Sequence, residues 1–336
     1  MEARQEIQEE INTNMDDFYK ALDWLKRFYH FILMYTKEGK PAKDYLLNRN
    51  ITEETMRKYS IGYVPANTKY TLVFLKSKGF SYRDLVNKKI LHRYRNGQLT
   101  TLFRDRIVFP IPDYQNNTVG FGGRLLSKKD DLPKYINSEE SNLFQRKDCL
   151  FGFDLAKEDI QNQGYAILLE GYFDVLTASQ NGVKNTVASL GTALTINQAL
   201  LLKSVTKNIV IAYDGDKAGN ENSFHAAALL DEIGCNVRIA CFPNDLDPDE
   251  LIISEGVDSF MEIVKEAQPI VAAFMNYKKN DYNLLDPISR YEYTDEVLKF
   301  ILNSNFNERE ALNKLQEVLG VSLETINNEV KRFLGT

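Results

Sequence analysis

Short apolar runs alternate with helical patterns between residues 160 and 256, and this alternation constrains the fold most. The apolar runs are YAILL (165–169), NTVASL (185–190), NIVIAY (208–213) and NVRIACF (236–242). Helical patterns follow at 172–182, 195–205, 217–234 and 249–256. Because apolar strands that alternate with helices are typical of βαβ units, we expect an α/β fold with a parallel sheet flanked by helices.

The flanking segments have a different texture. Residues 1–66 have a helical pattern, with two short helices expected within 41–65 and a helix start at Thr52, where a capping hydroxyl precedes Glu53 and Glu54. TLFRDRIVFPIPD (101–113) and NNTVGFGGRLL (116–126) predict a β-hairpin, with a close backbone approach or a bulge at Gly122-Gly123. Helical patterns fill 257–336, including 307–320 and 322–334.

We therefore expect three domains, so that the chain as a whole is α+β. They are a basic N-terminal α+β subdomain (1–152), the parallel-sheet subdomain (153–256) and a C-terminal helical subdomain (257–336).

Acidic residues follow three of the predicted strands. Glu170 comes directly after 165–169 with Asp174 four residues later, a DGD sequence holds Asp214 and Asp216, and a DPD sequence holds Asp247 and Asp249. Ligands gather at the carboxyl ends of the strands of an open parallel sheet, so these six carboxylates should converge on one edge. Carboxylate oxygens favour hard divalent cations, and the sequence predicts Mg²⁺ or Mn²⁺, with more than one ion expected, and Ca²⁺ as a further candidate.

The alternative is that these residues only cap helices and turns. Asp216 could cap the helix that follows it, and Asp249 could cap 249–256. Glu170 has no such role, because it ends a buried strand. Three strand ends that each carry a spaced acidic pair favour a metal site.

The charge is distributed unevenly along the chain. The net charge is −6, yet residues 67–150 hold 16 Lys and Arg against 8 Asp and Glu. Such asymmetry allows a basic face that binds phosphates in an acidic protein. Aromatic residues in this segment could stack on bases, although aromatic residues beside strands are more often core. The candidates are Tyr70, Phe103, Tyr114, Phe121 and Tyr135.

Cysteine, histidine and hydropathy patterns exclude other classes. Cys149, Cys235 and Cys241 have no CxxC spacing, so neither a disulfide framework nor a zinc site is expected, and a reducing cytoplasmic compartment fits. The three histidines have no ligand spacing. No apolar run approaches a membrane span, the N-terminus MEARQEIQEE is not a secretory signal, and no P-loop motif is present.

As an ordered set, the motifs resemble a known family. EGYFDV, DGDKAG and DPDE look like the Toprim domain of topoisomerases and primases. RDRIVFPI (104–111), GFGGR (120–124), PKYINS (133–138) and LFQRKDCLFG (143–152) precede them and look like the catalytic core of the DnaG-type bacterial DNA primase. The resemblance runs from about residue 20 to about residue 330.

The resemblance implies roles for particular residues. The six acidic residues match the Toprim metal ligands, and Glu170 would assist proton transfer, with Glu170, Asp214 and Asp216 as the catalytic group. The basic residues that match positions contacting template and triphosphate are Arg104, Arg106, Arg124 and Lys134. Arg146 stands where the family usually has Lys, with Lys147 adjacent, and which of the two takes that role stays open. Lys217 is a further triphosphate candidate, with a solvated helix-surface lysine as the alternative.

The resemblance also implies partners and departures. We expect single-stranded DNA, ribonucleoside triphosphates and an RNA primer–DNA hybrid as partners, and no membrane. The family's zinc-binding module and its C-terminal helicase-binding domain have no counterpart in this sequence. The chain should therefore be the catalytic core alone, without zinc, and helicase stimulation and template-sequence selection should be weak or absent.

The expected activity is synthesis of short RNA primers on a DNA template, by attack of a 3′-hydroxyl on an α-phosphate. Two alternatives stay open. A different Toprim enzyme, a topoisomerase or a nuclease, would use the same carboxylates, but the RDRIVFPI and GFGGR block disfavours both. A non-enzymatic single-strand-binding module with a degenerate site is disfavoured because all six carboxylates are present.

Overall fold

The computed structural model describes residues 2–127, 132–141, 144–191, 193–243, 246–302 and 308–320, with 322, 324 and 326; within these ranges the side chains of residues 2–14, 308–311 and 314 are not described. The chain forms two compact units. Unit 1 comprises Met1–Glu158 and Gly171–Gly191, and unit 2 comprises Asp159–Glu170 and Thr192–Thr336. These boundaries do not coincide with the three predicted domains, whose functional division stays a prediction.

Unit 1 is built on an antiparallel sheet in the order β1-β4-β5-β6. Its strands are β1 (Gly62–Val64), β4 (Arg106–Pro112), β5 (Thr118–Leu125) and β6 (Tyr135–Asn137). The predicted hairpin is confirmed, because β4 and β5 pair antiparallel around the turn in which the Asp113 amide donates to the Asn117 carbonyl. Two-residue strands β2 (His92–Arg93) and β3 (Leu99–Thr100) form a separate hairpin.

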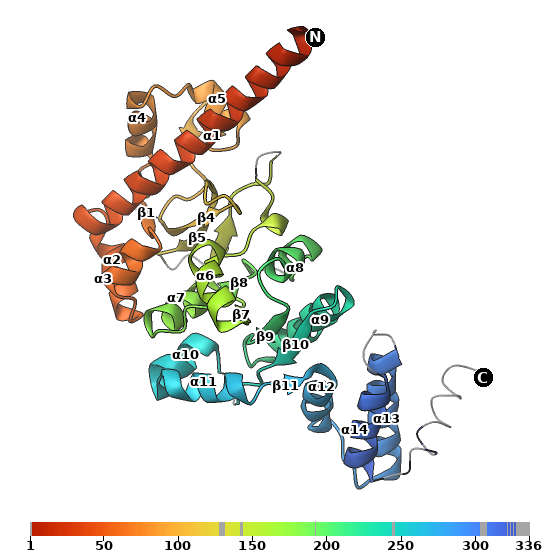
Figure 1. Cartoon of the computed structure of the whole chain (residues 1–336). Coiled ribbons are helices and arrows are strands. Elements are labelled where there is room, and N and C mark those ends of the chain that lie inside the picture. Colours follow the sequence, from red (N-terminus) through yellow and green to blue (C-terminus); the bar gives the residue numbers. More distant parts are fainter. Residues whose placement is uncertain are drawn as a thin grey trace. The chain divides into compact units, whose positions relative to one another are not determined.

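Helices surround this sheet, and the long helix α1 contacts β1 and β5 and also packs against α2 and α4 (Figure 1). The helices of unit 1 are α1 (Glu2–Tyr35), α2 (Lys40–Asn48), α3 (Glu53–Lys58), α4 (Lys69–Ser77), α5 (Tyr82–Asn87), the 3₁₀ turn η1 (Arg146–Asp148) and α7 (Tyr172–Gln180). The Thr52 hydroxyl accepts a hydrogen bond from the Thr55 amide, which confirms the predicted cap of α3. The short strand β8 (Thr186–Ala188) also belongs to unit 1, and α6 (Phe153–Gln163) crosses the boundary between the units.

Unit 2 contains the predicted parallel strands. Strands β7 (Ala166–Leu169), β9 (Asn208–Ile211) and β10 (Asn236–Ile239) pair in parallel in the order β10-β9-β7, and the two-residue β11 (Gln268–Pro269) pairs antiparallel with β10. All four residues of β7 are buried, as the continuous apolar pattern predicts.

The first three helices of unit 2 are those expected at 195–205, 217–234 and 249–256. The helices of unit 2 are α8 (Ile196–Lys203), α9 (Lys217–Glu232), α10 (Pro248–Glu255), α11 (Val257–Lys265), α12 (Ile270–Lys279), α13 (Pro287–Leu302) and α14 (Glu308–Leu319). The helix predicted at 307–320 is therefore confirmed, whereas most of the helix predicted at 322–334 lies outside the described residues. Within the described part of the chain, no helix is long and apolar enough to cross a membrane.

Candidate active site

Five of the six predicted carboxylates lie in unit 2, in the loops that follow its strands or in the first turn of a helix. Glu170 follows β7, Asp214 follows β9, and Asp216 is the N-cap of α9. Asp247 and Asp249 stand at the N-cap and in the first turn of α10. Glu170 and Asp214 therefore lie close to strand ends, as predicted, whereas Asp216, Asp247 and Asp249 stand at the starts of α9 and α10.

The other four carboxylates of unit 2 lie within electrostatic range of Asp214. Burial, and then repulsion from Glu170, Asp247, Asp216 and Asp249, raises the pKa of Asp214 to about 8. Burial and nearby negative charges both disfavour the ionised form of a carboxyl group. The edge of the sheet in unit 2 therefore concentrates negative charge around Asp214.

Glycines and backbone bonds fix the geometry of this edge. The Asp216 side chain accepts a hydrogen bond of 2.7 Å from the Gly219 amide, so Asp216 does cap α9. A Cβ at Gly219 would lie 2.2 Å from the Asp214 carbonyl oxygen, so glycine is required there. The Gly215 amide donates to the Leu246 carbonyl at 3.1 Å, which ties the DGD loop to the DPD loop.

Asp174, the sixth predicted carboxylate, belongs to unit 1. It is 6% exposed, and its Oδ2 accepts a hydrogen bond of 2.8 Å from the Gly171 amide at the start of α7. Asp174 therefore shapes the turn in the EGYFD motif, whatever further role it has.

The chemistry of this donor set suits a divalent cation, because it consists of oxygens with a surplus of negative charge. Glu170, Asp214, Asp216, Asp247 and Asp249 are the residues that would hold it. Over the described ranges, however, no three His, Cys, Asp or Glu side chains are arranged so that they could hold one ion.

A basic and aromatic cluster lies in unit 1 around Arg124, on β5. The Arg124 guanidinium lies 4.4 Å from the ring centroid of Tyr45, 5.5 Å from that of Phe173 and 5.9 Å from that of Tyr135. Its Nε also donates to the Tyr135 hydroxyl at 3.2 Å. We call Arg124, Tyr45, Tyr135, Phe173 and Arg49 the Arg124 cluster.

Arg49, at the C-terminal end of α2, is a member of this cluster that the sequence did not reveal. Its guanidinium lies 4.7 Å from the Phe173 ring centroid. Burial raises the pKa of the Tyr135 phenol. The positive charges of Arg124 and Arg49 partly offset this rise. No local motif marks Arg49, because it approaches the other members of the cluster only through the tertiary fold.

Arg106 requires a correction, since its side chain is part of the core and not of a phosphate-binding face. Arg106 is 3% exposed, and burial lowers the pKa of its guanidinium. It donates to the carbonyls of Gly123, Lys134 and Pro133 at 3.3, 3.2 and 2.9 Å. Arg106 therefore holds the backbone beside Lys134, and Lys134 remains exposed.

The other predicted cations occupy varied positions. Arg104 is exposed, with its guanidinium 5.9 Å from the Tyr94 ring centroid, and the Lys134 ammonium lies 5.7 Å from the Tyr135 ring centroid. Arg146 and Lys147 form part of η1, where Lys147 is exposed and Arg146 half-buried. Lys217 is exposed in unit 2 and lies 3.9 Å from Glu221, as expected for a helix-surface lysine.

Two of the five aromatic residues proposed for base stacking are core residues. Phe103 and Phe121 are 6% and 2% exposed, whereas Tyr70, Tyr114 and Tyr135 are 52%, 73% and 40% exposed. The two phenylalanines were therefore wrong as stacking candidates, and the three tyrosines remain available.

A hydrogen-bonded tie within unit 1 connects three of the sequence motifs with the backbone at Leu190. The Tyr172 hydroxyl donates to Asn137 Oδ1 at 2.7 Å, and Asn137 Nδ2 donates to the Leu190 carbonyl at 3.3 Å. A Cβ at Gly122 would lie 1.9 Å from the Tyr172 hydroxyl, so the glycine leaves space for this ring. GFGGR, PKYINS, EGYFD and the turn at Leu190 therefore depend on one another, and the predicted close approach at Gly122 is confirmed.

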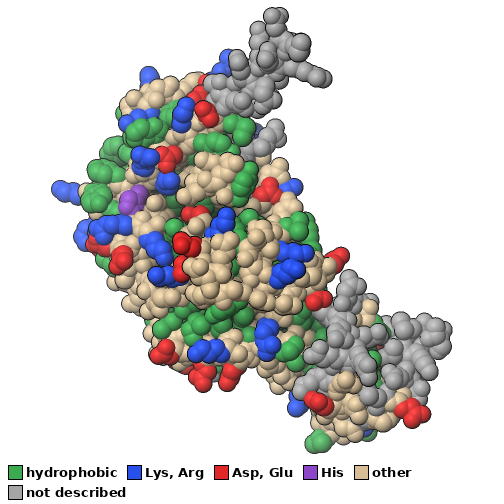
Figure 2. Space-filling view, viewed as in Figure 1, with side chains coloured by type: hydrophobic (Ala, Val, Ile, Leu, Met, Phe, Trp, Pro, Cys, Tyr) green, Lys and Arg blue, Asp and Glu red, His purple; other side chains and the backbone are tan. Residues whose placement is uncertain are grey.

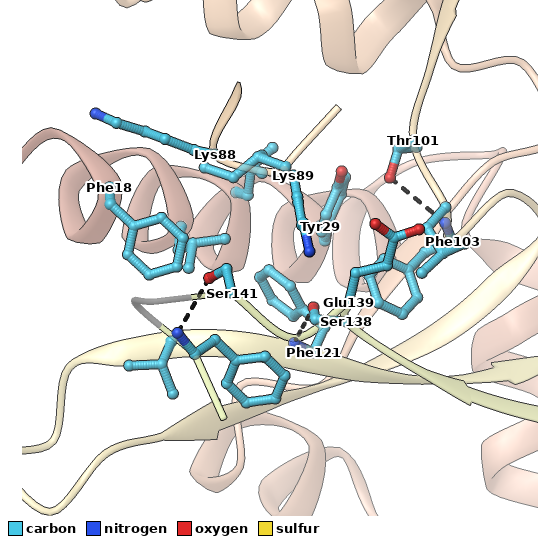
Figure 3. Close-up of a pocket in the computed structure, with 16 residues that line it drawn as sticks. Phe18, Tyr29, Lys88, Lys89, Thr101, Phe103, Phe121, Ser138, Glu139 and Ser141 are labelled. Atoms are coloured by element: carbon cyan, nitrogen blue, oxygen red, sulfur yellow. Dashed lines mark hydrogen bonds between the residues drawn. The ribbon is translucent and has the colours of Figure 1, made fainter. Parts of the chain in front are cut away.

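Neither of the two described cavities is lined by the predicted carboxylates. A pocket of about 20 Å³ in unit 1, lined by Phe18, Tyr29, Lys89, Phe103 and Glu139 among others, has room for about one water molecule (Figure 3). A groove of about 1140 Å³ in unit 2 includes Asn208 and Asn236, at the amino ends of β9 and β10. The carboxylates lie at the opposite, carboxyl ends of these strands, so neither cavity is the candidate site.

Comparison with known proteins supports the same family that the motifs indicated. Residues 28–157 match the family model described as DNA primase catalytic core, N-terminal domain, and residues 167–252 match the one described as Toprim-like. A DNA primase of Geobacillus stearothermophilus is 39% identical over 310 residues, which are 92% of this chain and 51% of the relative. The chain thus spans about half the length of this curated relative.

Solved structures agree with the sequence relatives. The zinc-binding and RNA polymerase domains of the Aquifex aeolicus primase match with a TM-score of 0.79 and 32% identity, covering 93% of this chain and 75% of that one. A DnaG primase catalytic domain bound to single-stranded DNA matches with a TM-score of 0.77 and 28% identity, covering 94% of this chain and 99% of that one. The chain therefore belongs to the DnaG-type DNA primase family and corresponds to its catalytic core.

Proposed function

We propose that this chain synthesises short RNA primers on a single-stranded DNA template, from ribonucleoside triphosphates and with divalent cations. The observation that carries the proposal is the crowding of Glu170, Asp214, Asp216, Asp247 and Asp249 at one edge of the sheet in unit 2. Membership of the primase family indicates which reaction such a carboxylate cluster serves. The expected cation is Mg²⁺, with Mn²⁺ as the alternative.

The carboxylates would hold the cations, which, when bound, stabilise the attacking and leaving oxygens of an in-line displacement. Glu170 is the proposed acceptor of the proton from the attacking 3′-hydroxyl. The bond that forms joins this oxygen to the α-phosphorus of the incoming nucleotide. The bond that breaks releases pyrophosphate.

The Arg124 cluster would hold the anionic substrates. Arg124 and Arg49 present guanidinium groups against flat aromatic rings, and Lys134 and Arg104 add exposed cations in the same unit. Guanidinium groups bind phosphates through paired donors, and aromatic faces stack on bases. Arg146 or Lys147 would add a further phosphate contact. Lys217, at the start of α9, is a further candidate for contact with the triphosphate.

Within this proposal, the RNA primer–DNA hybrid is the product that remains on the protein. A replicative helicase stays a predicted partner of a longer primase chain. No step described above depends on it.

The test measures extension of an RNA primer annealed to a DNA template, with labelled ribonucleotides and Mg²⁺ or Mn²⁺. Asp214→Asn should reduce extension about 100-fold or more, in the range found when one electrostatic contributor to a transition state is removed. Asp258→Asn, a matched change at an exposed residue in the first turn of α11, should leave extension unchanged.

Near-normal extension by a folded Asp214→Asn protein would refute the role of the carboxylate cluster. Degradation of the template on the same gel would instead assign the carboxylates to a nuclease.

A further inference from the structure

An exposed aromatic stripe runs along α1, which carries none of the Arg124 cluster residues. Trp24, Phe28, Phe31 and Tyr35 follow one another at spacings of four, three and four residues, which places them on one face of the helix. Trp24, Phe31 and Tyr35 are 37%, 52% and 64% exposed. Exposed aromatic side chains gathered in this way mark interaction surfaces more often than isolated ones do.

Helix α4 continues this surface. The Phe28 and Phe74 rings stack with centroids 4.1 Å apart, and Trp24 meets Phe74 edge-on at 6.2 Å. Tyr70 and Val73, on the same helix, are 52% and 67% exposed. We call this surface the α1–α4 face, made of Trp24, Phe28, Phe31, Tyr35, Tyr70, Val73, Phe74 and Lys78.

Cations stand against the aromatic rings of this face. The Lys78 ammonium, at the C-cap of α4, lies 3.7 Å from the Trp24 ring centroid, and the Arg27 guanidinium lies 5.6 Å from it. Arg27 is also paired with Asp23 at 2.8 Å. Figure 2 shows hydrophobic side chains together with Lys and Arg in the part of the surface that carries α1 and α4 in Figure 1.

The segment that carries α4 is the most basic part of unit 1. Residues 67–100 contain eight Lys and Arg and one acidic residue, Asp84, so their net charge of +7 accounts for most of the net +8 of residues 67–150. Among the described residues, none of these eight cations forms an ion pair with a carboxylate. An excess of cations without acidic partners favours an anionic ligand.

We propose that the α1–α4 face binds single-stranded DNA, as a second template contact separate from the Arg124 cluster. Aromatic platforms that alternate with cations are the features with which proteins hold single strands without reading their sequence. The aromatic rings would stack on bases while Lys78 and its basic neighbours contact phosphates. This inference rests on the proposed function, in which such a strand is the template.

Trp24 makes the proposal directly testable, because it is the only tryptophan in the chain. Its fluorescence therefore reports on the α1–α4 face and on no other site. Titration of the intact chain with an oligothymidylate should quench this emission, and added salt should reverse the quenching. Binding is measured in parallel by the anisotropy of a labelled oligothymidylate.

Variants separate stacking from charge. Tyr70→Ala and Trp24→Ala should each weaken binding about 5- to 150-fold, as expected for the loss of one stacked base. Lys78→Ala should reduce the slope of log affinity against log salt by about 0.7, the contribution of one phosphate contact in a single strand. Lys265→Ala, at an exposed lysine in the last turn of α11 in unit 2, is the matched control and should change neither quantity.

The outcomes are distinct from those of the primer-extension test. Unchanged Trp24 emission while anisotropy shows bound DNA would overturn the α1–α4 face and leave the proposed function standing. Quenching without any primer extension would support the face and refute the proposed function. Because Trp24→Ala could disturb the packing of α4, unaltered binding by a folded Tyr70→Ala protein would also count against the proposal. Quenching by a polyglutamate peptide but not by DNA would assign the face to an acidic protein partner.

Discussion

Replacing Gly122 by alanine tests the interdependence of the motifs in unit 1. A Cβ at this position would lie 1.9 Å from the Tyr172 hydroxyl and 2.3 Å from its Cζ. Tyr172 cannot withdraw easily, because it is 6% exposed and its ring stacks on Phe109 at 4.5 Å and meets Phe151 edge-on at 4.8 Å. The variant must therefore shift either β5 or α7.

The expected cost follows from the contacts that are lost. Overpacking a buried site costs about 1–3 kcal/mol, and the hydrogen bond from Tyr172 to Asn137 contributes about 1 kcal/mol. Replacing a glycine within a strand returns about 0.5–1 kcal/mol, because the unfolded chain loses conformational freedom. The net loss should be about 1–3.5 kcal/mol, which lowers the melting temperature by roughly 2–14 °C at about 2–4 °C per kcal/mol for a domain of 150–250 residues.

Thermal unfolding followed by circular dichroism measures this effect, with Gly120→Ala as the matched control. Gly120 lies in the same strand, but a Cβ there would meet Ser138 at 3.1 Å and Phe144 at 3.2 Å, so its cost should stay below about 1 kcal/mol. In a Tyr172→Leu background the cost of Gly122→Ala should fall by about 1 kcal/mol or more, since the two positions touch. Equal melting temperatures for wild type and Gly122→Ala, or strictly additive effects in the double variant, would refute the reasoning.

Two further predictions concern stability. Arg106→Leu should destabilise the fold by about 2–4 kcal/mol, because the carbonyls of Gly123, Pro133 and Lys134 lose their donors. Arg104→Leu, at an exposed position, is the control and should change the denaturation midpoint little. Equal midpoints for the two variants would return Arg106 to the group of proposed phosphate contacts. Lys278 and Tyr282 donate to Glu296 and, against the effect of burial, hold its pKa below the ordinary value. This stabilisation is complete above the unfolded pKa of about 4.3 and is lost as pH falls through the lower folded pKa, so Glu296→Gln should lower the melting temperature more at pH 7 than at pH 3.

The strands and carboxylates of unit 2 were predictable because their signals are local. The runs that became β7 and β9 are continuous, apolar and followed directly by acidic residues, so that periodicity and chain order alone placed Glu170 and Asp214 at strand ends. The capping hydroxyl of Thr52 and the turn between β4 and β5 were equally local.

The features that escaped prediction depend on the tertiary fold. Strands β1 and β6 have three residues each, too few for a local sequence pattern. They form because β1 pairs with β4 and β6 pairs with β5. Arg104 and Arg106 look equivalent in the sequence, yet one side chain is exposed and the other donates to three carbonyls. Arg49 is far from Phe173 in the sequence, and no pattern of residue spacing predicts the contact between them.

The most direct test of the central claim is synthesis on unprimed single-stranded DNA, with labelled ribonucleoside triphosphates and either Mg²⁺ or EDTA. The account predicts short RNA whose sequence depends on the template, formed with Mg²⁺ and absent with EDTA. RNA of the same amount and length in EDTA would contradict the assignment of the carboxylates around Asp214 as the metal-holding catalytic group.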